Sequence, residues 1–156
     1  MAIVTFYRDH PNPPKTTRGA KLGVNAVITN NGKILLEKRS DCDMWGLVGG
    51  GVKKQENELD AIVREIYEET GLRVSKDQIK KLGVYGEPGR IAAYQDGSIW
   101  RMVIVAYGLE LDERIKLKIS RESKDLRFFS KDELKQIEIV VTHSDIVEKW
   151  FLNAEK

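Results

Sequence analysis

The stretch that decides the fold is residues 50–72, which read GGVKKQENELDAIVREIYEETGL. Apolar residues in it recur with the period of an α-helix, at Leu59, Ile62, Val63 and Ile66. Gly71 then supplies the residue type that favours the left-handed conformation at a helix C-terminus. The pattern predicts a helix that reaches Thr70, buries one face and ends at Gly71.

This predicted helix carries an acidic cluster. Glu65, Glu68 and Glu69 stand at i, i+3 and i+4, so their carboxylates project from one side of the helix. Clustered carboxylates without His or Cys suit a hard cation such as Mg²⁺ or Mn²⁺. For three glutamates alone, an ordinary solvated acidic face is the alternative interpretation.

The rest of the chain has mostly the pattern of strands. Lys21–Asn30 and Lys33–Lys38 are predicted to form a hairpin around Asn31 and Gly32. Residues 45–51 are dense in glycine and are expected to form a loop. Further strands are predicted at 79–85, 91–94, 99–109 and 126–129, and short helices at 131–136 and 142–152. His143 is expected on the surface at the start of the last helix.

Residues 1–19 look separate from the rest of the chain, which suggests an N-terminal arm followed by a domain over residues 20–156. Ile3–Tyr7 has the composition of a short edge strand, and three prolines follow at Pro11, Pro13 and Pro14. Because the arm stands apart from the core pattern, we consider that it packs across a second subunit in a homodimer.

Composition bounds the function. The chain has 156 residues, 41% of them hydrophobic and 32% charged, with a formal net charge of +2. These values indicate one globular domain and give little reason to expect nucleic-acid binding. Cys42 is the single cysteine, which excludes an internal disulfide and a multi-cysteine zinc site. No apolar run is long enough to cross a membrane and no secretory signal is visible, so a cytoplasmic location is expected.

The fixed positions of one known motif are all present. Gly50, Glu56, Arg64-Glu65, Glu68-Glu69 and Gly71-Leu72 match the Nudix box, so the chain resembles the Nudix hydrolases. Residues 45–50 are similar to the family's Trp-x-Leu-Pro-Gly-Gly, with Val48 where proline is usual. The resemblance covers roughly residues 20–136. It implies an α/β protein with the Nudix fold, an α/β/α sandwich around a mixed β-sheet.

The resemblance also implies a reaction, the hydrolysis of a nucleoside diphosphate linked to another group. Divalent ions neutralise the phosphates and lower the pKa of bound water in such reactions. By analogy with the family, the metal ligands would be Glu65, Glu68, Glu69 and the carbonyl of Gly49. The ion would be Mg²⁺, with Mn²⁺ as a substitute.

Other box residues have supporting roles in the family. Arg64 would orient the neighbouring glutamates, and Gly50, Glu56 and Gly71 would hold the local structure. Glu56 has two open interpretations, contact with a metal through water or capping of the helix. The general base would be a box glutamate, Glu68 or Glu69, or Glu122 from a later loop, for which a plain surface role is equally open.

Candidate substrate-binding residues are aromatic or cationic. Trp45 and Tyr94 offer rings for stacking, although core packing is the alternative for each. Arg39 and Arg101 are able to bind phosphates with two hydrogen bonds. Pro88 lies where members of the family that cleave ADP-ribose tend to have proline, which slightly favours that substrate.

Several alternatives remain open for the substrate and for the function class. The chain could be a nucleoside-triphosphate pyrophosphatase or an RNA 5′-end pyrophosphohydrolase, in which case an RNA end would be a partner. A nucleotide-binding Nudix module without turnover is the alternative of another class. An isomerase of prenyl diphosphates is disfavoured because the surroundings of Cys42 do not match its nucleophile motif.

Overall fold

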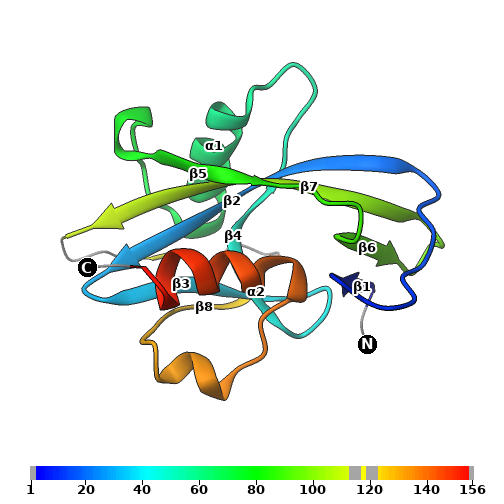
Figure 1. Ribbon diagram of the computed structural model, residues 1–156. Helices are drawn as coiled ribbons and strands as arrows, with labels where there is room; N and C mark the ends of the chain where they lie inside the picture. The colour runs from blue at the N-terminus through cyan, green and yellow to red at the C-terminus, as the bar shows by residue number, and fades with distance from the viewer. Residues whose placement is uncertain (1–2, 113–116, 119–122, 155–156) are drawn as a thin grey trace.

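A computed structural model describes residues 3–112, 117–118 and 123–154 (Figure 1). Its strands are β1 (Val4–Tyr7), β2 (Gly19–Asn30), β3 (Lys33–Arg39), β4 (Trp45–Gly51), β5 (Lys80–Tyr85), β6 (Ile91–Tyr94), β7 (Ile99–Leu111) and β8 (Ser123–Phe129). The helices are α1 (Glu58–Thr70) and α2 (Val141–Val147), and α2 continues into a π-helical turn, Glu148–Leu152. Short 3₁₀ turns span Lys76–Gln78 and Glu133–Gln136.

The strands form one mixed sheet in the order β1-β6-β7-β2-β4-β3-β8, with β5 also paired to β7. β2 and β7 run parallel along their whole length, from the pair Gly19 and Trp100 to the pair Asn30 and Leu111. The other strand pairs within the described residues are antiparallel. β5 and β6 pair with different halves of β7.

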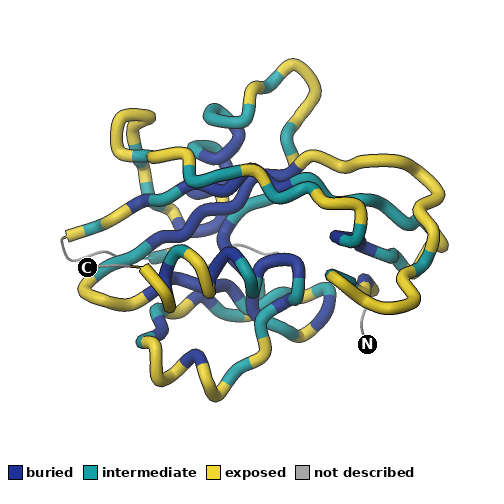
Figure 2. The backbone as a smooth tube through the Cα atoms, in the orientation of Figure 1, coloured by how far each residue is buried: buried dark blue, intermediate teal, exposed yellow. Residues whose placement is uncertain are grey.

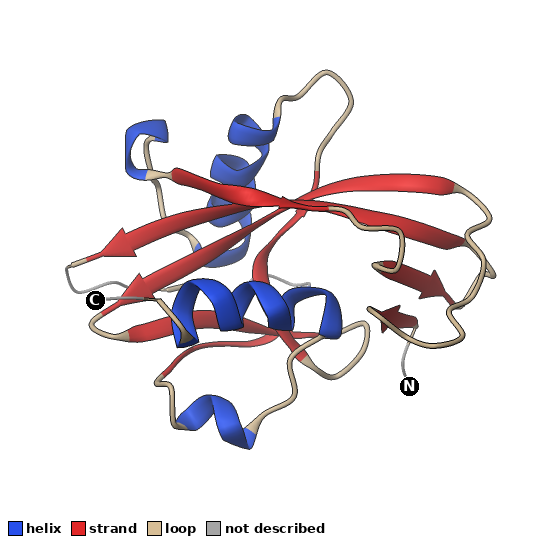
Figure 3. Cartoon of the chain, in the orientation of Figure 1, coloured by secondary structure: helices blue, strands red, loops and turns tan. Residues whose placement is uncertain are grey.

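The two helices lie on opposite faces of this sheet (Figure 3). Ile62 and Ile66 of α1 pack against side chains such as Val24 and Leu35 from one face. Ile146 and Phe151 pack against the other face. Buried residues therefore follow the middle of the sheet and the inner side of each helix (Figure 2). This confirms the predicted α/β/α arrangement with a mixed sheet.

The predicted loop at residues 45–51 is wrong, because these residues form strand β4 between β2 and β3. Backbone pairing of residues 48–51 with β2 and of residues 45–47 with β3 compensates for the weak strand propensity of glycine. Gly49 has φ +154°, and a Cβ at this position would lie 2.0 Å from the carbonyl oxygen of Val24. The glycines therefore permit close approach within the sheet rather than a turn.

The N-terminal strand joins the sheet of its own chain. β1 pairs antiparallel with β6, from Val4 opposite Tyr94 to Tyr7 opposite Ile91. The amide of Ile3 donates to the carbonyl of Asp41 over 2.8 Å. Residues 3–7, considered above as an arm over a second subunit, thus have their pairing partner in cis. No helix within the described residues is long and apolar enough to cross a membrane.

Candidate active site

Helix α1 ends at Thr70 as predicted, and both of its ends are capped. The side chain of Asn57 accepts a hydrogen bond from the amide of Asp60, and Gly71 adopts φ +78° and donates to the carbonyl of Tyr67. Glu65 and Glu69 continue the buried stripe of the helix and are 8% and 4% exposed. The side chain of Glu68, by contrast, is 49% exposed. A solvated acidic face is therefore wrong for Glu65 and Glu69.

Arg64 ties the neighbouring carboxylates together. Its Nε and Nη2 donate to Glu56 over 2.8 and 2.9 Å, and its Nη1 donates to Glu65 over 2.9 Å. The same Nη1 lies 3.3 Å from Glu68, and Nη2 donates to the carbonyl of Gly51 over 3.0 Å. The hydrogen bonds from Arg64 lower the pKa of Glu56 to about 2. Arg64 thus holds Glu56, Glu65 and the end of β4 in one arrangement.

The glycines of β4 bring the backbone against the glutamates of α1. The amide of Gly49 donates to Oε1 of Glu69 over 2.7 Å. A Cβ on Gly50 would lie 2.6 Å from Oε1 of Glu65. Any side chain at position 50 would therefore displace Glu65, which gives a local reason for glycine at this position.

Sequence reasoning missed a further carboxylate, that of Glu37 on β3. Glu37 is buried and accepts a 2.8 Å hydrogen bond from the hydroxyl of Ser123. Its carboxyl group also lies within hydrogen-bonding reach of Glu69. Burial and the hydrogen bond and charge of Glu37 raise the pKa of Glu69 well above its usual range. The signal in the sequence is a glutamate directly after the apolar run Ile34–Leu36.

A cavity of about 320 Å³ lies beside this pair, between the sheet, the last turn of α1 and the first turn of α2. One part is lined by Glu37, Glu69 and the glycines Gly49 and Gly50. Another part is lined by side chains from β1, β3, β6 and α2, namely Phe6, Arg39, Tyr94 and His143. The cavity therefore joins an acidic end to an end with aromatic and nitrogen-bearing side chains.

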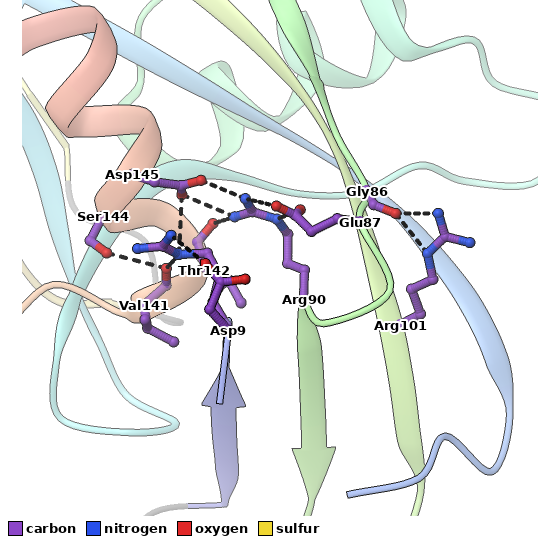
Figure 4. A network of polar contacts seen from close by, with 10 residues as sticks. Asp9, Gly86, Glu87, Arg90, Arg101, Val141, Thr142, Ser144 and Asp145 are labelled. Carbon is purple, nitrogen blue, oxygen red and sulfur yellow. Dashed lines mark hydrogen bonds and ion pairs between the residues drawn. The ribbon is translucent and has the colours of Figure 1, made fainter. Parts of the chain in front are cut away.

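The structure brings some of the predicted site residues to this cavity and leaves others outside it. Arg39 and Tyr94 line it, but Arg39 is already paired with Asp41 through two hydrogen bonds of 2.8 and 2.7 Å. Trp45 does not line it and packs edge-on against Phe129 at 4.7 Å between ring centroids. Arg101 points to the carbonyl of Gly86 (Figure 4). Glu122 lies outside the described residues.

The expectation that His143 lies on the surface is wrong, because the residue is only 5% exposed. Its Nδ1 accepts a 3.0 Å hydrogen bond from the amide of Leu47, so the helix start is pressed onto β4. The amide of Val140, just before α2, donates to the carbonyl of Trp45 over 2.9 Å, which is a second contact between the start of α2 and β4. Burial, then the charges of Arg39 and Arg90, lower the pKa of His143 to about 3. The ring is therefore neutral at physiological pH.

The acidic end of the cavity fits a divalent cation. Within the described residues, no three Asp, Glu, His or Cys side chains are already gathered into a metal cluster. The buried carboxyl groups of Glu37 and Glu69 nevertheless face each other, an arrangement that favours either a bound proton or a cation. Carboxylate oxygens are the donors that Mg²⁺ and Mn²⁺ prefer.

Comparisons with known proteins agree with the motif. The model of the NUDIX domain matches residues 19–150. The ADP-ribose pyrophosphatase of Methanocaldococcus jannaschii is 32% identical over 132 residues, which cover 83% of this chain and 72% of that protein. The putative 8-oxo-dGTP diphosphatase of Bacillus subtilis is 44% identical over 62 residues, 40% of each protein. The chain thus spans well under two thirds of that second relative.

Solved structures show the same fold. The NUDIX domain of Shewanella oneidensis NrtR, complexed with ADP ribose, has a TM-score of 0.70 at 21% identity. That similarity covers 89% of this chain and 91% of the NrtR domain. With the box in place, the helix α1 and the glycine strand β4 as described, and a family model that spans most of the sequence, the chain belongs to the NUDIX domain family.

Proposed function

We propose that the protein is a pyrophosphohydrolase that cleaves the diphosphate linkage of nucleoside diphosphate derivatives with the help of Mg²⁺ or Mn²⁺. The observation that carries this proposal is the buried Glu69, held by the amide of Gly49 at the wall of a cavity. A carboxylate buried at the wall of a cavity has little solvent to balance its charge, so a cation bound there, facing a phosphate, would stabilise it. The M. jannaschii relative, which is similar over most of this chain, is named as an ADP-ribose pyrophosphatase, that is, as an enzyme that cleaves a diphosphate bond.

In the proposed mechanism the metal would be held by the side chains of Glu65, Glu68 and Glu69 and by the carbonyl of Gly49. The metal, when bound, neutralises phosphate charge and lowers the pKa of water. Arg64 fixes Glu65 and Glu56 through its hydrogen bonds, so it acts on the site by positioning. A box glutamate or Glu122 takes the proton from the attacking water.

The proposed substrate is of the ADP-ribose type. Pro88 follows the box at the family's ADP-ribose position, and the M. jannaschii relative is named as an ADP-ribose pyrophosphatase. Tyr94 and Arg39 line the cavity beyond the acidic end and would contact the part of the substrate outside the metal site. Nucleoside triphosphates and RNA 5′ ends are the alternatives, since other relatives are named as a putative 8-oxo-dGTP diphosphatase and an RNA pyrophosphohydrolase.

The test is product release by the purified protein with Mg²⁺ across ADP-ribose, nucleoside triphosphates, dinucleoside polyphosphates and 5′-triphosphate RNA. Glu69→Gln is the site variant, and Glu110→Gln, which changes an exposed glutamate, is the matched control. We expect AMP and ribose 5-phosphate from ADP-ribose, absent with E69Q and unchanged with E110Q. Activity confined to triphosphates or RNA would replace the substrate, and nucleotide binding without any product would favour the non-catalytic module.

A further inference from the structure

Two carboxylates occupy positions that would otherwise belong to the hydrophobic core. Leu35 and Glu37 lie two residues apart on β3 and so share the face of the sheet that α1 covers. Ile62, Ile66 and Glu69 follow one another along the buried stripe of α1. The strand and the helix thus each end their apolar series in a glutamate, and the two glutamates meet.

The charges of this pair are not balanced by the protein around them. Among the described residues, neither Glu37 nor Glu69 has a Lys, Arg or His nitrogen within 4.0 Å. The nearby guanidinium of Arg39 is engaged by Asp41 at 2.7 Å. The donors that reach the pair are neutral, the hydroxyl of Ser123 and the amide of Gly49. Two buried carboxylates with neutral donors retain a strong demand for positive charge.

We propose that Glu37 is an additional ligand of the divalent cation, contributed by β3 rather than by the box helix. This inference rests on the proposed function, which places that cation at Glu69. Glu37 lines the same cavity as Glu69, Gly49 and Gly50, so a cation held by Glu69 has the carboxylate of Glu37 within reach.

The fold keeps Glu37 in place for this role. Its backbone lies on β3, which is paired on both sides, opposite Gly46 on β4 and Leu126 on β8. The Ser123 hydroxyl occupies one acceptor position on Oε2, and an ionised carboxylate offers about four such positions. Glu37 is therefore oriented by a neutral donor and still has lone pairs for a metal.

The rival explanation is that Glu37 only positions Glu69 through a shared proton. The two roles differ in what happens to metal affinity when the charge of Glu37 is removed. A ligand contributes charge to the cation, whereas a proton-sharing partner competes with it, so its removal would leave metal binding unchanged or stronger.

The experiment is a calorimetric titration of Mn²⁺ into metal-free wild type, Glu37→Gln and the control Glu110→Gln, without nucleotide. We expect E37Q to weaken Mn²⁺ binding by about tenfold or more and to reduce the rise in Tm that Mn²⁺ produces. The Tm of metal-free E37Q should equal or exceed that of wild type, since one of two facing acids is neutralised. E110Q should bind Mn²⁺ as wild type does. Mn²⁺ affinity of folded E37Q within about twofold of wild type would overturn the assignment.

Glu37→Asp provides a second variant should the glutamine not be tolerated in the fold. It keeps the charge but withdraws the carboxylate by one methylene, so we expect weaker Mn²⁺ binding here too, and unaltered binding would count against ligation. Failure of the inference is distinct from failure of the proposed function. Wild type that hydrolyses its substrate and binds Mn²⁺ while E37Q binds equally well removes only the role of Glu37. Wild type that neither binds Mn²⁺ nor hydrolyses any substrate removes both.

Discussion

Two groups of buried charges lie in different parts of the molecule, and they differ in balance. The first is the pair Glu37 and Glu69, which has two acids and neutral donors around it. The second centres on Arg90, which is 0% exposed and pairs with Glu87 and Asp145 at 2.6 Å each (Figure 4). Arg8 adds a contact to Asp145 at 3.7 Å and donates to the carbonyl of Val141 over 2.8 Å.

The two groups differ in whether their buried charges are neutralised by the protein itself, which distinguishes a structural role from a role in binding. Arg90 is satisfied by its acidic partners and by the carbonyl of Thr142, so it joins the end of the β5–β6 connection to α2 and requires nothing from outside. The acidic pair lacks such partners within the described residues. We therefore interpret the Arg90 group as a structural ion-pair network and the acidic pair as part of a cation-binding site.

The largest effect is expected when one carboxyl group of the acidic pair Glu37 and Glu69 is replaced. Glu69→Gln should lower turnover by roughly 10³-fold or more, because it removes a charge that holds the metal against the phosphates. The fold should persist and the Tm of the metal-free protein should change little, because the raised pKa of Glu69 keeps it neutral there and the amide is its neutral isostere. Steady-state rates and thermal unfolding of the same sample check both parts. A folded E69Q with wild-type turnover would contradict the metal assignment.

The second-largest effect is expected when Arg90 is removed from its group, in which the charges are balanced. Arg90→Met leaves Asp145 and Glu87 without their buried partner and should lower the free energy of unfolding by about 3–5 kcal/mol. Chemical denaturation measures it. Lys135→Met is the matched control, because the Lys135 side chain is 77% exposed and its ion pair with Asp132 should contribute about 1 kcal/mol or less. Equal losses in the two variants would show that the Arg90 group has no special structural role.

His143 lines the cavity beside the acidic pair and directly follows Thr142, whose carbonyl accepts a hydrogen bond from Arg90. Its protonation should make the stability of the fold depend on pH. Its pKa of about 3 in the fold lies below the ordinary value of 6.5, so the unfolded chain binds the proton more readily. The stabilisation from the neutral ring is complete above pH 6.5 and is lost as pH falls toward 3, by roughly 1.4 kcal/mol per pH unit.

Between pH 5 and 6.5 the raised pKa of Glu69 makes stability fall as pH rises, opposite to the effect of His143, so the contribution of His143 is measured as a difference between wild type and a variant. We expect His143→Asn to remove the contribution that makes stability rise with pH, so its slope should be more negative than that of wild type, and His10→Gln, at an exposed position, to leave the slope unchanged. Equal slopes of stability against pH for wild type and H143N would contradict the neutral, buried state of His143.

The smallest effect is expected at the rim of the balanced group. Arg90 lowers the pKa of Glu87 through its hydrogen bond, so this contribution is present above the ordinary pKa of 4.5 and is lost as pH falls below it. The Glu87 side chain is 45% exposed, so solvent screens it and Glu87→Gln should cost about 1 kcal/mol or less at neutral pH. Chemical denaturation at pH 7 compares the loss of unfolding free energy in E87Q with that in R90M. A loss as large as that of R90M would show that Glu87, rather than Asp145, is the main partner that stabilises the charge of Arg90.

Helix α1 could be predicted from the sequence because its signals are local. The apolar period through Ile62 and Ile66, and the glycine at its end, depend only on neighbouring residues. The spacing of Glu65, Glu68 and Glu69 is equally local, which is why the box was recognisable. Strand β4 could not be predicted, because its glycines form a strand only through partners that distant segments supply, β2 for residues 48–51 and β3 for residues 45–47.

Glu37, His143 and Arg90 share the opposite property. Each is a single polar residue in an ordinary strand, helix or loop pattern, and its burial depends on what another segment brings to it. Glu37 meets Glu69 from 32 positions away in the chain only through packing of α1 on β3. Such residues become visible as part of a site only in three dimensions.

The most direct measurement of the central claim is the titration of Mn²⁺ into metal-free wild type and Glu69→Gln near neutral pH, with Arg90→Met as the comparison from the balanced group. We predict saturable binding to wild type, binding that is lost or strongly weakened in E69Q, and binding that is retained by R90M under conditions where it is folded. Equal Mn²⁺ affinity of folded E69Q and wild type would show that the buried acids are not a cation site.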